Sequence, residues 1–308
     1  MKKFLALLLC AVALNFFMPV QSYANEIDLN TDDTSAVDGE IEKFYASLPV
    51  AKDYKVRQRP ILIQGAMNVE TKILVHALKN PVAYRELNYL FVAGTYKNYP
   101  VVVARTEQGI SNAAASTALA IKKFNPVAVI NQGTAGGMVP TLHRNDIVIG
   151  SKSFPVAAIK TAYSPKGAGV DFKQQIMRGT FAYDEAKKIF QPCGEYPADK
   201  TLLDVAEKVA AANKNFNVTT GAISSADWWM DWVDYVSFLH ETYGVTCTEM
   251  ETASAAQICH NAGVSFIGIR VISDNVSGNE EYSFAPADTC QNFVLLVTES
   301  YIRDVLKK

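Results

Sequence analysis

The sequence has few of the residues and none of the motifs that usually mark a metal, a nucleotide phosphate or a nucleic acid. It holds only four histidines, and no two of its five cysteines have the spacing of zinc ligands. Neither the P-loop pattern nor the G-x-G-x-x-G fingerprint of dinucleotide-binding folds is present. The 29 lysines and arginines form no basic cluster. We therefore expect no metal, no cofactor and no nucleic-acid partner.

Long hydrophobic runs are equally scarce, and the only one stands at the N-terminus. A basic start precedes an apolar stretch over residues 4–17, and Ser22 and Ala24 frame a small-residue cleavage site. The pattern predicts a signal peptide over residues 1–24, so the protein is expected to be exported, either periplasmic or secreted. Pro19 ends the run too early for an uncleaved membrane anchor. No later segment has 18 consecutive apolar residues, so no membrane contact is expected after cleavage.

Removal of the signal peptide would leave a mildly acidic chain with four cysteines. The peptide carries two lysines and no acid, so 27 basic residues would face 31 acidic ones, a formal net charge of −4 (27 − 31). An exported protein meets an oxidising compartment, in which disulfides persist. Disulfides and buried free thiols are therefore both open for the remaining cysteines, which are Cys193, Cys247, Cys259 and Cys290.

Beyond the signal peptide, a polar leader precedes a run of alternating strands and helices. The leader, residues 25–58, is acidic with a short helix expected over 41–48, and the folded domain is expected over 59–308. Residues 151–198 are expected to form a long loop insertion. Strands are expected over 60–64, 89–93, 101–106, 127–131, 147–150, 217–221, 245–247 and 265–272. Helices are expected over 68–79, 111–124, 199–213, 230–243, 251–261 and 288–307. This order predicts an α/β fold whose mostly parallel central sheet is covered by helices on both faces.

Polar and small residues gather where these strands end, which is where open α/β folds bind ligands. Glu70 falls in the first turn of an expected helix, where an acid alone usually stabilises the helix dipole. The small residues of 131–137 leave backbone N–H groups available to a phosphate or a sugar. Trp228 and Trp229 offer a flat surface for stacking a base, although core packing explains a tryptophan equally well.

Two further acids, Glu251 and Asp274, are expected near neighbouring strand ends. One carboxylate can hold a diol while the other protonates a leaving base, and cleavage of an N-glycosidic bond needs both functions. The reaction places positive charge on the sugar, which an ionised carboxylate nearby stabilises. The proton donor must keep its proton, so its surroundings must raise its pKa.

Four segments, taken in order and at these spacings, resemble the nucleoside phosphorylase superfamily. Within it they are most similar to the 5′-methylthioadenosine/S-adenosylhomocysteine nucleosidases. The segments are Gly65-Ala66-Met67 with Glu70, residues 131–137, Glu249-Met250-Glu251, and residues 270–274. The resemblance covers roughly residues 60–305 apart from 151–198, and it implies a single-domain nucleoside phosphorylase-like fold.

The resemblance also implies roles for individual residues. Glu70 would activate a water molecule, Asp274 would protonate the purine at N7, and Glu251 would hold the ribose hydroxyls. Met250 would pack on the sugar. The other residues implied to bind substrate are Thr134, Ala135, Gly136, Trp229, Met230, Arg270 and Ser273.

The same residues favour hydrolysis over phosphorolysis. A phosphate needs cations around it, and Arg270 is expected to partner Glu251 or the water, while Glu70 would repel a phosphate. We therefore expect an exported purine nucleosidase that hydrolyses adenosine-type nucleosides. There are two alternatives. One is a phosphate-dependent purine nucleoside phosphorylase, and the other is a nucleoside-binding or storage protein with weak or no catalysis.

Nucleosidases of this kind pair two subunits, so the resemblance implies a homodimer in which a loop of the partner completes the pocket. We expect residues 151–170, with Phe154, Pro155 and Tyr163, to lie at or near that interface.

Overall fold

The computed structural model describes residues 35–307. The predicted signal peptide and the first part of the leader lie outside the described residues. Within them no helix has the length and the hydrophobicity needed to cross a bilayer.

A ten-stranded mixed sheet forms the centre of the molecule and confirms the expected α/β class. Its strands are β1 (Ile61–Gly65), β2 (Lys79–Glu86), β3 (Tyr89–Tyr96), β4 (Tyr99–Arg105), β5 (Ala128–Gly137), β6 (Ile147–Pro155), β11 (Tyr196–Pro197), β12 (Val218–Ser225), β13 (Val245–Glu249) and β14 (Ser265–Asp274). The pairs β1–β4, β1–β5, β5–β14, β6–β12 and β12–β13 are parallel, whereas the β2–β3–β4 edge is antiparallel. All five residues of β1 are buried, as expected for a strand covered on both faces.

Five of these strands also close into a ring. β6 pairs with β12, β12 with β13, β13 with β5, β5 with β14, and β14 with β6. One pair of neighbouring strands in the ring, β5 and β14, comes from distant parts of the sequence. The ring therefore fixes the ends of β5, β13 and β14 relative to one another.

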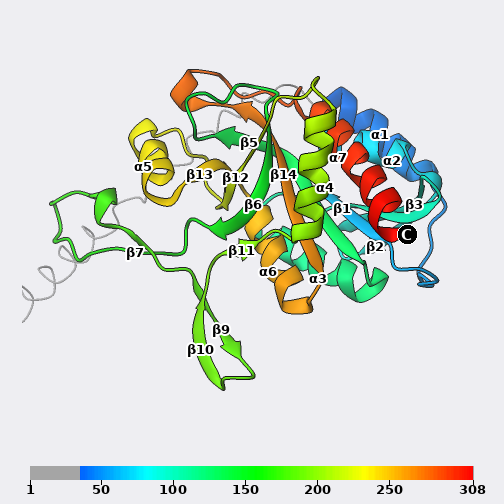
Figure 1. The fold of residues 1–308 in the computed structure, drawn as a ribbon, viewed down its shortest axis with the longest axis horizontal. Helices are drawn as coiled ribbons and strands as arrows, with labels where there is room; N and C mark the ends of the chain where they lie inside the picture. Colours follow the sequence, from blue (N-terminus) through cyan, green and yellow to red (C-terminus); the bar gives the residue numbers. More distant parts are fainter. Residues whose placement is uncertain (1–34, 308) are drawn as a thin grey trace, which may run out of the picture. The chain divides into compact units, whose positions relative to one another are not determined.

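Two layers of helices cover the sheet, as Figure 1 shows. The alternation of β1 explains the layers, because Ile61 and Ile63 face one hydrophobic core and Leu62 faces the other. Helices α1, α2, α4 and α7 pack on the first core, and α3 and α6 on the second. The helices are α1 (Ser35–Ser47), α2 (Asn68–His76), α3 (Ile110–Phe124), α4 (Lys200–Ala212), α5 (Val233–Tyr243), α6 (Thr252–Ala262) and α7 (Ala287–Tyr301).

Several expected boundaries are wrong, and each error has a local cause. Strand β2 begins at Lys79, the residue at which the helix before it was expected to end. Helix α2 already ends at His76, and Asn80, with a φ of 52°, lies inside β2 where its register with β3 shifts. Helix α5 begins at Val233 rather than Met230, so the preceding aromatic residues remain in a loop. Strand β14 extends as far as Asp274, which makes this acid its last residue.

The folded part begins before residue 59, because α1 is longer than the expected 41–48 helix and belongs to the core. Ile41 and Tyr45, one turn apart on α1, are 1% and 3% exposed and pack against α2 and the sheet. The four cysteines of the described residues are free thiols, and three of them are buried, so the structure favours the second of the two alternatives.

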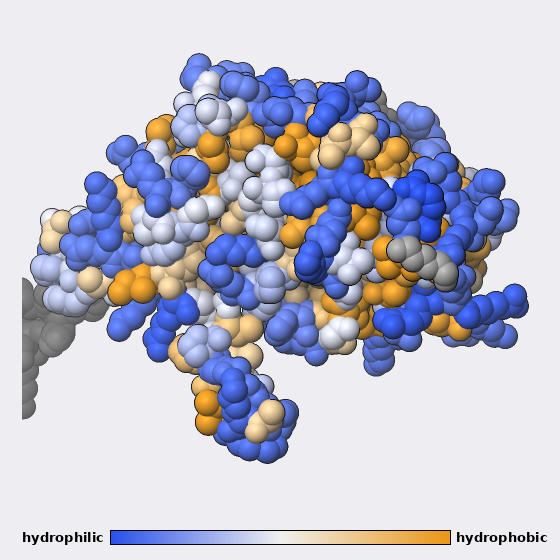
Figure 2. Space-filling model, in the orientation of Figure 1, coloured by the Kyte–Doolittle hydropathy of each residue, from blue (hydrophilic) through white to orange (hydrophobic). Residues whose placement is uncertain are grey.

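The insertion 151–198 is more regular than a loop. After β6 it forms the short strands β7 (Ile159–Lys160) and β8 (Ile176–Met177), and then a hairpin of β9 (Thr180–Asp184) and β10 (Ile189–Cys193). The hairpin projects from the sheet in Figure 1, and Figure 2 shows apolar atoms along one side of it. Tyr183 and Phe190 face each other across its two strands.

Candidate active site

A pocket of about 710 Å³ opens at the carboxyl ends of β1, β5, β13 and β14. The loop after β12 closes one side of it. The structure brings ten of the eleven predicted site residues to its wall, and Arg270 is the one it leaves out. The ten are Glu70, Thr134, Ala135, Gly136, Trp229, Met230, Met250, Glu251, Ser273 and Asp274.

The carboxylate of Glu70 is held by four donors. Its Oε2 accepts hydrogen bonds from the backbone N–H groups of Ala66 at 2.8 Å and Met67 at 3.2 Å, in the turn between β1 and α2. Its Oε1 accepts from the backbone N–H of Thr134 at 2.8 Å and from the Thr134 hydroxyl at 3.2 Å. Backbone N–H groups at a helix start have no other partner, so they hold an acid strongly. Glu70 thereby joins the ends of β1 and β5.

Asp274, at the end of β14, lies next to β5 of the same pocket. The hydroxyl of Ser273 donates to its Oδ1 at 2.6 Å. Burial raises the pKa of this carboxyl above its usual range, the Ser273 hydrogen bond opposes that rise, and nearby Asp231 adds to it. Gly136 leaves room for the side chain, because a Cβ there would come within 3.2 Å of the Asp274 Oδ2. The surroundings therefore favour a carboxyl group that keeps its proton.

Glu251 occupies the N-cap position of α6 and is 6% exposed. Its Oε1 accepts a hydrogen bond from the backbone N–H of Gly109 at 2.9 Å, and its Oε2 lies 3.7 Å from the Arg270 Nη2. Burial first, and then the neighbouring carboxylate of Glu249, raise its pKa to about 8 against the opposing effects of Arg270 and the Gly109 N–H. In the free pocket this group favours its protonated form at neutral pH.

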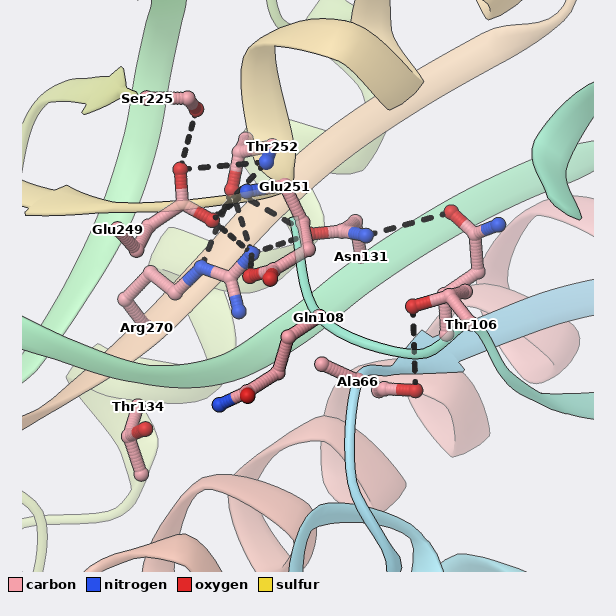
Figure 3. Close-up of polar contacts among 12 residues, drawn as sticks. Ala66, Thr106, Gln108, Asn131, Thr134, Ser225, Glu249, Glu251, Thr252 and Arg270 are labelled. Atoms are coloured by element: carbon pink, nitrogen blue, oxygen red, sulfur yellow. Dashed lines mark hydrogen bonds and ion pairs between the residues drawn. The ribbon is translucent and has the colours of Figure 1, made fainter. Parts of the chain in front are cut away.

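Arg270 was expected to contact Glu251 or the water, but its main partner is Glu249. The two side chains form a buried ion pair, and Arg270 also donates to Asn131 and Thr252 (Figure 3). Glu249 in turn accepts from the N–H groups of Glu251 and Thr252 at the start of α6. Arg270 is only 1% exposed, so it belongs to the support of the pocket rather than to its wall.

One guanidinium nitrogen of Arg270, Nη1, has no hydrogen-bond partner in the described part of the chain. It lies beside Gly133, where a Cβ would come within 2.4 Å of this nitrogen and 2.5 Å of the Glu70 Oε1. Because Gly133 has no side chain, the guanidinium of Arg270 and the carboxylate of Glu70 can both approach the backbone there.

Some residues of the pocket were not expected from the sequence. Gln108 lines it from the turn before α3, and Tyr282 packs edge-to-face on Trp229 with ring centroids 4.8 Å apart. Neither residue belongs to a sequence motif, so their positions in the pocket could be recognised only from the structure. Glu249 stood in the Glu-Met-Glu motif, but its ion pair with a residue 21 positions away leaves no mark in the sequence. Met138, Val236 and Val276 were not expected either, whereas Ala66, Met67, Gly137, Trp228 and Thr248 lie in or beside segments that the sequence had singled out.

The raised pKa of Glu251 predicts how stability changes with pH. The folded-state pKa of about 8 lies above the ordinary value of 4.5, so the contribution of this group is fully present below pH 4.5 and is lost as the pH rises through about 8. We expect the unfolding free energy of the protein to fall between pH 5 and pH 9 relative to that of Glu251→Gln, measured by denaturant titration. The exposed Glu40, changed to Gln, is the control. Parallel pH curves for wild type and Glu251→Gln would contradict the prediction.

The described residues contain no group of three side chains that could hold a metal ion. The pocket is lined by the carboxyl groups of Glu70, Glu249, Glu251 and Asp274, and none of the described residues that line it is a lysine or an arginine. Its charge suits a ligand that is neutral or becomes positive.

The sequence model of the phosphorylase superfamily matches residues 60–301. The chain belongs to this superfamily. The match spans β1 to α7, and so all eleven predicted site residues, whereas α1 lies before it.

Within this superfamily, the chain is similar to proteins that share one name. A protein of Anoxybacillus flavithermus named 5′-methylthioadenosine/S-adenosylhomocysteine nucleosidase is 32% identical over 225 residues, which are 73% of this chain and 89% of that protein. A Shewanella protein of the same name is 33% identical over 223 residues, 72% of this chain and 88% of its own.

Solved structures of related proteins have a similar fold. The nucleosidase of the same name from Neisseria meningitidis, in complex with methylthio-immucillin-A, superimposes with a TM-score of 0.65 at 25% identity and covers 79% of this chain and 100% of that one. A futalosine hydrolase mutant of Helicobacter pylori has a TM-score of 0.65 at 21% identity, with 79% and 99% covered. At that identity the second likeness concerns the fold alone. The single-domain nucleoside phosphorylase-like fold is confirmed.

Proposed function

We propose that the protein is a purine nucleosidase that hydrolyses the N-glycosidic bond of adenosine-type nucleosides such as 5′-methylthioadenosine and S-adenosylhomocysteine. The names of its relatives support the substrate class. The observation that carries the proposal is the position of Glu70 and Asp274 on one pocket wall formed by β1, β5 and β14.

In this mechanism the carboxyl proton of Asp274 passes to N7 of the purine. The electron pair of the glycosidic bond moves onto the base, which leaves as a neutral molecule. A water oxygen bonds to C1′ of the sugar, and its proton passes to Glu70. The raised pKa of Asp274 supports the first step, and the four donors that hold Glu70 support a fixed position for the base.

The rest of the pocket fits the two halves of a nucleoside. Glu251 and Met250 would take the sugar hydroxyls and the sugar face, while Trp229 and Met230 would take the purine. The exposed ring of Trp229, held by Tyr282, would cover the base from the solvent side.

Hydrolysis is favoured over phosphorolysis by the charge of the pocket. A phosphate dianion would enter beside the carboxylate of Glu70, and the guanidinium of Arg270 is already paired with Glu249. Water carries no charge and meets no such repulsion.

This proposal predicts free base and free sugar as products. We expect the purified protein to release adenine from 5′-methylthioadenosine at the same rate with and without inorganic phosphate, measured by chromatography of both products. Sugar 1-phosphate as a product would assign a phosphorylase instead. Tight binding of the nucleoside without any turnover would favour the binding or storage alternative.

We further propose that the chain is exported to the periplasm or the medium, on the strength of residues 1–24. N-terminal sequencing of the protein from its native compartment should begin at Asn25.

We propose that the protein is a homodimer, with the insertion at the interface. Phe154 is unsuited to a contact with a partner because it is 1% exposed and packs inside its own subunit, whereas Tyr163 is 91% exposed. We expect light scattering to give twice the monomer mass, and Tyr163→Ser to lower that mass at micromolar concentration. A fully active monomer would rule the arrangement out.

A further inference from the structure

Helix α1 lies before the part of the chain that matches the superfamily, yet it reaches two segments that build the pocket. Its apolar side is an ordinary core contact, in which Ile41 and Tyr45 pack on α2. Its acidic side is different, because Asp38 and Glu42 bind polar residues of α2 and β4. The role of that side goes beyond covering the core.

The acidic side of α1 holds two residues, Asn68 and Arg105, that are close in sequence to residues of the pocket wall. The Nδ2 of Asn68 donates to the Asp38 Oδ1 at 2.9 Å and to the Glu42 Oε1 at 3.3 Å. Arg105 forms an ion pair with Glu42 and also donates from Nη1 to the Asn68 Oδ1 at 3.0 Å. Its Nε donates to the Glu107 Oε1 at 3.0 Å. These five side chains form one connected network.

Each end of the network leads into the pocket within a few residues. Asn68 is the first residue of α2, and Glu70 follows two positions later in the same turn. On the other side, Glu107 precedes Gln108, which lines the pocket, and Gly109, whose N–H donates to Glu251. The same α1 acids therefore hold two segments of the pocket. One carries Glu70, and the other carries the Gly109 N–H that donates to Glu251.

We propose that α1 is a positioning element of the active site. Asp38 and Glu42 act through Asn68 and Arg105, and they fix the start of α2 and the turn before α3 in the arrangement that catalysis needs. The purine side of the pocket, around Trp229, is built from other elements, and it meets the start of α3 where the Ile110 N–H donates to Asp227 at 2.8 Å. The inference rests on the proposed function, since it takes Glu70 as the residue that activates water.

The test compares the full-length processed chain with the double variant Asp38→Asn/Glu42→Gln. We expect kcat to fall about five- to tenfold in the double variant, because charge-assisted hydrogen bonds become neutral ones. The dissociation constant of adenine should stay within about twofold of wild type, because the base half of the pocket is untouched. The matched control is Glu40→Gln, an exposed acid on the same helix, which should leave both values unchanged.

A second comparison separates positioning from stability. Ile41→Ala removes the core contact of α1 and should lower Tm while leaving kcat near wild type. The double variant should show the opposite pattern, with kcat lowered about five- to tenfold and Tm nearly unchanged. A double variant with wild-type kcat, or one that loses only Tm as Ile41→Ala does, would overturn the proposal.

Hydrogen exchange gives a result that does not depend on activity. Amides over residues 66–71 and the Gly109 amide should exchange about threefold faster or more in the double variant than in Glu40→Gln, because their anchors are weakened. If the wild-type protein cleaves no nucleoside, the proposed function fails, while this measurement still tests α1. Unchanged hydrogen exchange at both segments would contradict the positioning role of α1, whether or not the protein is active.

Discussion

Asp274→Asn is expected to lower kcat by about 100-fold or more while the protein still binds nucleoside. The amide keeps the shape of the side chain and can still form a hydrogen bond with N7 of the purine, but it has no carboxyl proton to give. The leaving purine would then have to depart as an anion. Steady-state kinetics with 5′-methylthioadenosine, together with a binding titration of the unreactive variant, measure the two effects separately.

The matched control for Asp274→Asn is Asp234→Asn, the same change at an exposed acid in the first turn of α5. It should leave kcat within about twofold of wild type, as is usual for surface changes away from a site. If Asp274→Asn kept near-normal turnover while Glu251→Gln alone abolished it, protonation of the purine would be wrong. The mechanism would then have to be rebuilt around Glu251 and Arg270.

Glu70→Gln is expected to have the second large effect, a fall in kcat of about 100-fold, because an amide cannot take the proton of the attacking water. It should also cost stability. Both carboxylate oxygens accept hydrogen bonds from N–H groups, so the NH₂ of glutamine must face at least one of these donors. A loss of about 1–3 kcal/mol in unfolding free energy follows from a buried donor left without an acceptor.

The two effects of Glu70→Gln are separated by measuring kcat well below the unfolding transition and by titrating adenine. In the proposed arrangement adenine lies against Trp229 and Met230 rather than Glu70, so its affinity should be kept. Thr134→Val is a useful companion, because it removes only the hydroxyl contact to Glu70 at 3.2 Å and should lower kcat by less than about tenfold. Glu70→Gln with full turnover would show that another group activates the water.

The sequence predicted the acidic residues of the site better than it predicted the residues that contact them. Glu70 stands in the first turn of the helix after β1, Glu251 two residues after β13, and Asp274 at the end of β14, so predicting where the strands end also located the acids. Their neighbours in space were harder to predict. Tyr282 reaches Trp229 from 53 positions away (282 − 229), and no local pattern records such a contact.

The role of Arg270 could not be predicted for a related reason. Its sequence position, two residues before Ile272 on a buried strand, indicates only that it is enclosed. Which of the three nearby acids it pairs with depends on distances of an ångström or two, and these are set when β13 and β14 are joined through β5. Helix α1 was underestimated because the polar residues beside it suggested a leader, although Ile41 and Tyr45 have helical spacing.

The closed ring of five strands has a consequence for the order of events during folding. Strand β14 is its last member in the chain, and it joins β5 to β6 from more than a hundred residues away (265 − 155 = 110). Contacts between such distant segments form slowly, because a long stretch of chain loses its freedom when they close. The ring therefore cannot close before β14 is in place, and Asp274, its last residue, reaches the pocket with that strand. A chain interrupted before β14 would lack Asp274 and also Arg270, the buried partner of Glu249.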